Sequence, residues 1–202
     1  MRTFTDRRQP QRSDQRRVAI LESLDHHLQE SSFESINIAD ISRRAGVTRS
    51  AFYFYFENKA AAVAALMEQM YDDAFVATEQ LTTDEGTPEE RIRAATDALF
   101  DTAQRHRYLS RAMLQARASS AAVRDMWDSD RASFVPPVAA MIDAERRSGR
   151  APDGPDPTLL ATLLLEFNDR LLERLTAGGA LSREQLAEGA VTIWLRTIYG
   201  TR

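Results

Sequence analysis

Residues 36–66 read INIADISRRAGVTRSAFYFYFENKAAAVAAL, and this stretch decides the fold. It predicts two short helices, because Asn37 and Thr48 are good N-caps and Gly46 supplies a left-handed residue that ends the first helix. Two short helices joined by a three- or four-residue turn with a glycine form a helix-turn-helix, whose second helix enters the major groove of DNA. The stretch therefore predicts a DNA-binding head.

The second helix of this motif, RSAFYFYF, divides into two faces. Phe52 and Phe56 are four residues apart and can pack under the preceding helices. Arg49 and Tyr53 lie off that face, and Ser50 is small enough to let the backbone approach DNA closely. A wholly buried aromatic stripe is the alternative interpretation. Five aromatic residues in a row cannot all face one core, however, so the pattern favours DNA contacts.

At these residues the chain resembles the TetR family, which has I-A-x-x-A-G-V-S/T, an aromatic-rich recognition helix and then a lysine. Here the motif reads Ile41, 45–48, 52–56 and Lys59, with Ser42 in place of the usual alanine. Segments such as ARASSAAVRDMW and TIWLRTIYG are similar to the EthR-type repressors of that family. The residues expected to contact DNA are Asn37, Thr48, Arg49, Ser50, Tyr53, Tyr55 and Lys59. A lysine at a helix start opposes the helix dipole, and a nearby phosphate would explain it, although a plain surface lysine is the alternative.

Turn signals divide the whole chain into about nine helices with no convincing strand, which predicts an all-α, TetR-like fold. One long helix is expected over 120–148, kinked at Pro136 and Pro137. We expect a disordered basic arm over 1–13, a helix-turn-helix domain over 14–58, and a ligand-binding and dimerisation domain over 59–202. The arm is either solvated or tracks phosphates and the minor groove.

Charge and composition exclude several classes of protein. Residues 1–59 hold ten basic and eight acidic side chains, whereas the other 143 residues hold 16 basic and 22 acidic ones. A basic end on an acidic body can present a positive face to DNA. There is no cysteine, no Gly-rich phosphate loop and no catalytic or metal-binding set, so we expect no enzyme activity, cofactor or metal site. No apolar run approaches the ~20 residues of a membrane span, and a cytoplasmic location is expected.

Asn168 is the polar residue that stands out in the C-terminal part. It lies in LLLEFNDRLL, where an amide among leucines needs a partner. The EthR-type resemblance implies that it points into a ligand pocket, and a solvated or capping asparagine is the alternative. The residues expected to line this pocket are Leu99, Ala103, Trp127, Phe134, Phe167, Asn168 and Trp194.

The resemblance implies a two-fold dimer formed by the helices at 157–177 and 183–199. The second carries apolar residues in excess of what one small domain needs to hide, namely Leu186, Ile193, Trp194 and Ile198. Such a dimer binds a palindromic operator. We therefore expect a repressor that a small apolar ligand releases from DNA. The alternative is a small-molecule-binding helical protein whose head mediates protein contacts.

Overall fold

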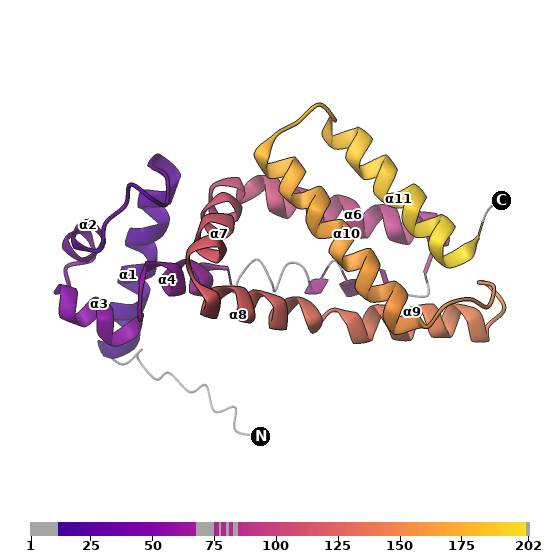
Figure 1. Cartoon of the computed structure of the whole chain (residues 1–202), viewed down its shortest axis with the longest axis horizontal. Helices are drawn as coiled ribbons and strands as arrows, with labels where there is room; N and C mark the ends of the chain where they lie inside the picture. The colour runs from indigo at the N-terminus through magenta and orange to yellow at the C-terminus, as the bar shows by residue number, and fades with distance from the viewer. Residues whose placement is uncertain (1–11, 68–74, 77, 80, 83–84, 201–202) are drawn as a thin grey trace, which may run out of the picture.

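All regular structure in the described residues is helical. The computed structural model describes residues 12–67, 75–76, 78–79, 81–82 and 85–200 (Figure 1). The helices are α1 (Arg12–Glu30), α2 (Ile38–Arg44), α3 (Arg49–Tyr55), α4 (Lys59–Leu66), α6 (Pro88–Arg105), α7 (Arg107–Ser119), α8 (Ala121–Ala132), α9 (Val135–Arg147), α10 (Pro157–Ala177) and α11 (Arg183–Tyr199). The all-α prediction is confirmed for this part of the chain. Most of the expected basic arm lies outside the described residues.

The helix-turn-helix begins and ends at the residues expected from the sequence. The Asn37 side chain accepts a hydrogen bond from the backbone N–H of Asp40 at 2.9 Å, and Thr48 accepts one from Ala51 at 3.1 Å. Gly46 has a φ of 65°, which a side chain with a Cβ rarely adopts. These interactions fix the turn between α2 and α3 and thereby the direction of α3.

The prediction of a single kinked helix over 120–148 is wrong. Two helices, α8 and α9, replace it, and the chain breaks at Ser133 and Phe134. Pro136 and Pro137 lie in the first turn of α9. The N–H groups of a first turn have no partner inside a helix, so prolines are tolerated there. The proline pair therefore starts a helix instead of bending one.

One hydrophobic core joins α1–α4, which we call the head, to α7 and α8. Leu24 of α1, Phe52 of α3, Val63 of α4 and Met113 of α7 belong to this cluster, and each is at most 1% exposed. In Figure 1, α7 lies between the head and the rest of the molecule. A hydrogen bond supports the same junction, because the Tyr108 hydroxyl of α7 donates to Asp25 of α1 at 2.7 Å.

A second core lies between α6, α9, α10 and α11. We call these four helices, together with α7 and α8, the body. It contains a buried ion pair, in which Arg91 of α6 donates to Glu145 of α9 at 3.0 Å. Arg150 donates to the same carboxylate at 2.9 Å. Burial acts to raise the pKa of Glu145, but the hydrogen bonds from Arg150 and Arg91 outweigh it, and the pKa lies below its ordinary value. No helix in the described ranges is both long and apolar enough to cross a membrane.

Candidate DNA-binding surface and ligand cavity

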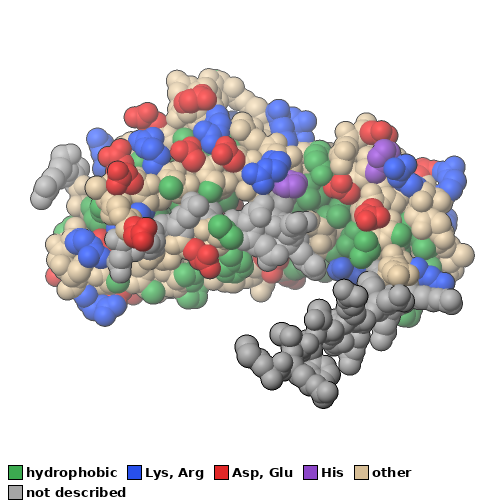
Figure 2. Space-filling model, turned by 180° about the vertical axis from the view of Figure 1, so that it is seen from behind, with side chains coloured by type: hydrophobic (Ala, Val, Ile, Leu, Met, Phe, Trp, Pro, Cys, Tyr) green, Lys and Arg blue, Asp and Glu red, His purple; other side chains and the backbone are tan. Residues whose placement is uncertain are grey.

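Helix α3 presents a mixed polar and aromatic surface to the solvent. Phe52 is fully buried under it, and Phe56 is 5% exposed at its C-cap. Arg49 and Ser50 are exposed in its first turn, and Tyr53 is 49% exposed. The division of this helix into a buried and an exposed face is therefore as the sequence predicts. On the face of the molecule in Figure 2, acidic and basic side chains are interspersed and no single charged patch dominates.

The predicted DNA-contacting residues occupy different positions. Asn37 and Thr48 are exposed, but their side-chain oxygens already cap α2 and α3. Arg49, Ser50 and Tyr53 share the exposed surface of α3. Tyr55 is half-buried, with its ring against that of Phe54 in an edge-to-face arrangement at 5.0 Å between centroids.

Lys59 has partners inside the head. Its ammonium donates to the backbone carbonyls of Phe33 and Ile36 and lies 4.2 Å from the centre of the Phe33 ring. Burial lowers the pKa of Lys59, and the nearby charge of Glu34 opposes this shift. The two carbonyls give the cation at the start of α4 partners within the chain itself. Lys59 therefore joins α4 to the turn between α1 and α2.

Phe54 was missed by the sequence analysis. It is 79% exposed, more than any other large hydrophobic side chain in the described part of the chain. Its position relative to Phe52 carried the signal, because residues two apart on a helix lie about 200° apart around its axis. Once Phe52 is assigned to the core, Phe54 must point outward.

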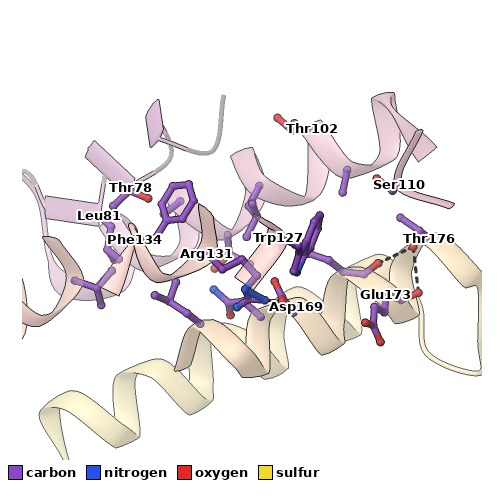
Figure 3. Close-up of a pocket in the computed structure, with 18 of the residues that line it drawn as sticks. Thr78, Leu81, Thr102, Ser110, Trp127, Arg131, Phe134, Asp169, Glu173 and Thr176 are labelled. Carbon is purple, nitrogen blue, oxygen red and sulfur yellow. Dashed lines mark hydrogen bonds and ion pairs between the residues drawn. The ribbon is translucent and has the colours of Figure 1, made fainter. Parts of the chain in front are cut away.

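A mostly apolar, partly open cavity of about 170 Å³ lies among α6, α7, α8 and α10. Figure 3 shows Leu81 and Phe134 toward one end of it, and Ser110 and Thr176 at the other. Helix α10 contributes one stripe at intervals of three and four residues, which consists of Leu165, Asn168, Asp169, Leu172, Glu173 and Thr176. A cavity of this order of volume can hold a small apolar molecule.

The cavity brings together most of the predicted ligand-binding residues. Its lining includes Leu99, Ala103, Trp127, Phe134, Asn168 and Trp194. Phe167 is not part of the lining, and this prediction is wrong. The residue lies between two positions of the α10 stripe and is therefore directed away from the cavity. It continues instead a line of apolar residues on the other side of α10, after Leu159 and Leu163.

Asn168 has the partner that its apolar surroundings require. Its Oδ1 atom accepts a hydrogen bond from the indole N–H of Trp194 at 3.0 Å. An indole only donates, so it must face the amide oxygen of Asn168. The side-chain NH₂ group is thereby left as a hydrogen-bond donor at the cavity wall. Asn168 can thus present a donor, and not an acceptor, to a ligand.

Charged residues also line the cavity, and the sequence analysis did not assign them to it. Arg131 of α8 forms an ion pair with Asp169 of α10, and Figure 3 shows the two side chains directed toward one another. Arg117 lies 3.9 Å from Glu173. Asp169 and Glu173 are four residues apart and therefore share one face of α10, and this signal was available in the sequence. Each carboxylate has a cationic partner, so the charged part of the cavity wall is largely charge-balanced.

The outer sides of α10 and α11 are partly apolar. Leu159 and Leu163 are each 52% exposed on α10, and Ile193 is 41% exposed on α11. Three other residues expected to contribute to a dimer bundle are buried within the chain itself, namely Leu186, Trp194 and Ile198, which are 5%, 3% and 1% exposed. Their apolar character stabilises the body and gives no information on a dimer.

Both parts of the chain match known protein families. Residues 20–66 match the family described as bacterial regulatory proteins, tetR family. Residues 92–200 match the family described as transcriptional regulator EthR, C-terminal domain. The second match covers more than half of the chain, and the first covers the helix-turn-helix and α4.

Whole-length relatives agree with these matches. The chain is 32% identical over 191 residues to the HTH-type transcriptional regulator EthR of Mycobacterium tuberculosis strain H37Rv, which covers 93% of this chain and 88% of the relative. The EthR of Mycolicibacterium smegmatis is also 32% identical, over 194 residues and with the same coverage. Among solved structures, SmeT, the repressor of a Stenotrophomonas maltophilia multidrug efflux pump, has a TM-score of 0.66 at 22% identity. The match covers 89% of this chain and 88% of the SmeT chain, and the two proteins share the fold. The chain therefore belongs to the TetR family of DNA-binding transcriptional regulators, with an EthR-type C-terminal domain.

Proposed function

We propose that this regulator is a dimeric repressor that acts in the cytoplasm and leaves its palindromic operator when a small, mostly apolar molecule fills the cavity of its body. The carrying observation is that the cavity and the core of the head share side chains. Met67 at the end of α4 and Met113 of α7 both line the cavity and belong to the core of the head. A ligand that displaces either residue must repack that core.

The shared residues give the ligand a way to favour one arrangement of the heads. A molecule can shift a conformational equilibrium only by as much as its affinity differs between the two states. Met67 and Met113 are 3% and 1% exposed, so both side chains are packed into the core of the head although they also border the cavity. Tight packing makes such a core change between discrete arrangements instead of deforming gradually. We infer that the occupied cavity favours heads spaced wrongly for DNA.

The lining indicates the chemistry of the ligand. Most of the wall is apolar, with aromatic residues Trp127 and Phe134 along α8 and at its end. The Asn168 NH₂ group offers a donor to a carbonyl or ester oxygen. The neighbouring ion pair of Arg131 and Asp169 is already satisfied, so the ligand needs no charge. We therefore propose a neutral hydrophobic molecule that carries one strong acceptor.

A dimer through α10 and α11 would bury the exposed apolar residues on their outer sides. Leu159, Leu163 and Phe167 recur every four residues and form one line along α10. Ile193 projects from the exposed side of α11. A two-fold axis through such a surface presents two α3 helices to successive turns of the major groove.

A single titration series tests the proposal. A preferred duplex would be selected from a random pool with the full chain, and its affinity measured by fluorescence anisotropy at several salt concentrations. We expect affinity to fall steeply with salt, because phosphate contacts release counterions. Neutral esters and ketones that raise the melting temperature should then release the duplex. A protein that selects no duplex but still binds these compounds would instead support a head that contacts other proteins.

A further inference from the structure

We propose that Phe54 determines operator specificity by packing its ring against the 5-methyl group of a thymine in the major groove. This inference rests on the proposed function, because it concerns the operator that the dimer selects. The family motif specifies only an aromatic-rich helix at this point, and the inference gives one of these aromatic residues a particular role.

The first observation is the exposure of the ring. Phe54 is 79% exposed, whereas the other exposed large hydrophobic side chains among the described residues range from 41% to 58%. Such a ring contributes nothing to the core of the head. A single exposed apolar side chain is common on protein surfaces, but this one lies on the second helix of a helix-turn-helix, where it is available to contact bases.

The second observation is the direction of the side chain. Phe52 is fully buried, and Phe54 lies about 200° from it around the α3 axis. Ser50 precedes Phe54 by four residues, so the two share the outer side of the helix. Ser50 is exposed and small, which leaves the ring of Phe54 as the most prominent group there. When α3 enters the groove, this side faces the base edges.

The third observation is that the ring has a defined neighbour. Its centroid lies 5.0 Å from that of Tyr55, at an interplanar angle of 87°. Tyr55 is half-buried and packs against the core of the head. This edge-to-face contact restricts the rotation of Phe54 before DNA arrives. A restricted side chain loses less entropy on binding.

The chemistry of the major groove then selects the partner. A phenyl ring has no donor or acceptor, so it cannot read phosphates or the polar base edges. Among the base edges in that groove, the 5-methyl group of thymine is the apolar one, and phenylalanine is among the side chains that contact it. Arg49 and Tyr53 are also exposed on α3 and can supply the polar contacts. Phe54 thus distinguishes thymine from cytosine or uracil at one position of each half-site.

Replacement of thymine by uracil tests the proposal, because it removes only the methyl group. The thymines of the selected operator would be replaced one position at a time, at the symmetric positions of both half-sites. The affinity of the full-length dimer for each duplex would be measured by anisotropy. At one position we expect about a fourfold loss per half-site, which corresponds to the ~0.8 kcal/mol from burial of one CH₂ group. Uracil outside the half-sites is the matched control.

The protein side of the experiment uses Phe54→Ala and Phe54→Leu. Both should fold normally, because the ring is exposed, and circular dichroism checks this. Phe54→Ala should bind the thymine and uracil operators equally, and Phe54→Leu should keep part of the difference. If Phe54→Ala binds too weakly to compare, Phe54→Leu and the wild-type scan decide. A wild-type protein insensitive to uracil at every position would overturn the role of Phe54 but not the repressor function. A pool that yields no preferred sequence would overturn both.

Discussion

Replacement of Lys59 by methionine tests whether this lysine serves the fold or the DNA. Methionine keeps the apolar stem but removes the ammonium that donates to the carbonyls of Phe33 and Ile36. A hydrogen bond with a charged partner contributes about 1.5–3 kcal/mol, and a cation over an aromatic ring adds about 0.5–1 kcal/mol at a partly exposed site. Some of this is offset, because methionine no longer has to desolvate a charge. We expect a net loss of about 3 kcal/mol.

The assay is thermal unfolding followed by circular dichroism, together with operator affinity at several salt concentrations. For a chain of this length, 3 kcal/mol corresponds to a decrease of roughly 6–12 °C in Tm. Arg49→Met is the matched control, because Arg49 is exposed on α3. It should leave Tm nearly unchanged and reduce the slope of log affinity against log salt by about one unit.

The opposite result for Lys59 would refute this reasoning. If Lys59→Met unfolds at the wild-type temperature but loses about one unit of salt slope, then the ammonium contacts a phosphate. The interaction with the turn between α1 and α2 would in that case make no contribution to stability. The family resemblance alone favours that outcome, whereas the hydrogen bonds in the structure favour a loss of stability.

Four further substitutions test other parts of the molecule. Leu163→Glu should dissociate the dimer without unfolding the chain, because Leu163 is 52% exposed; a wild-type protein that sediments as a monomer at micromolar concentration would contradict the dimer itself. Asn168→Leu should weaken binding of a neutral ester by about 1–3 kcal/mol in calorimetry, and Ala103→Trp should abolish it by filling the cavity; wild-type behaviour of both would place the ligand elsewhere. Glu145→Gln should cost about 3 kcal/mol at pH 7, because it leaves buried Arg91 without its charge partner. The lowered pKa of Glu145 means that its contribution exists above the ordinary carboxyl pKa and is lost as pH falls through the lowered pKa of the folded protein. Urea denaturation should therefore show the free energies of unfolding of the two proteins converging as the pH falls through that range.

Local signals in the sequence predicted the head well. Its caps and turn depend on residues within four positions of one another, such as Asn37 with Asp40 and Thr48 with Ala51. The partners of Lys59 could not be predicted in this way. They are backbone carbonyls 26 and 23 residues earlier in the chain. Every residue has a backbone carbonyl, so the type of residue does not indicate which carbonyl accepts the bond.

The body was harder to predict because α10 is apolar on more than one side. Leu164 packs in the core, Leu165 lines the cavity and Leu163 faces outward, although the three are consecutive leucines. Periodicity alone cannot divide such a helix into faces. Phe167 was therefore assigned to the wrong side. The ion pair between Arg131 and Asp169 was missed for a related reason, since it depends on how α8 and α10 pack together.

The continuous core between the head and α7 has a consequence for the construction of chimeric regulators. A head cut from this chain after residue 58 would lose Val63 and expose Leu24, which is 0% exposed in the intact chain. A cut after α4 would still remove Met113 and the hydroxyl that donates to Asp25. The smallest transferable unit is therefore discontinuous and includes α7 with α1–α4. Grafting this operator specificity onto another regulator requires a recipient whose own α7 can be replaced as well.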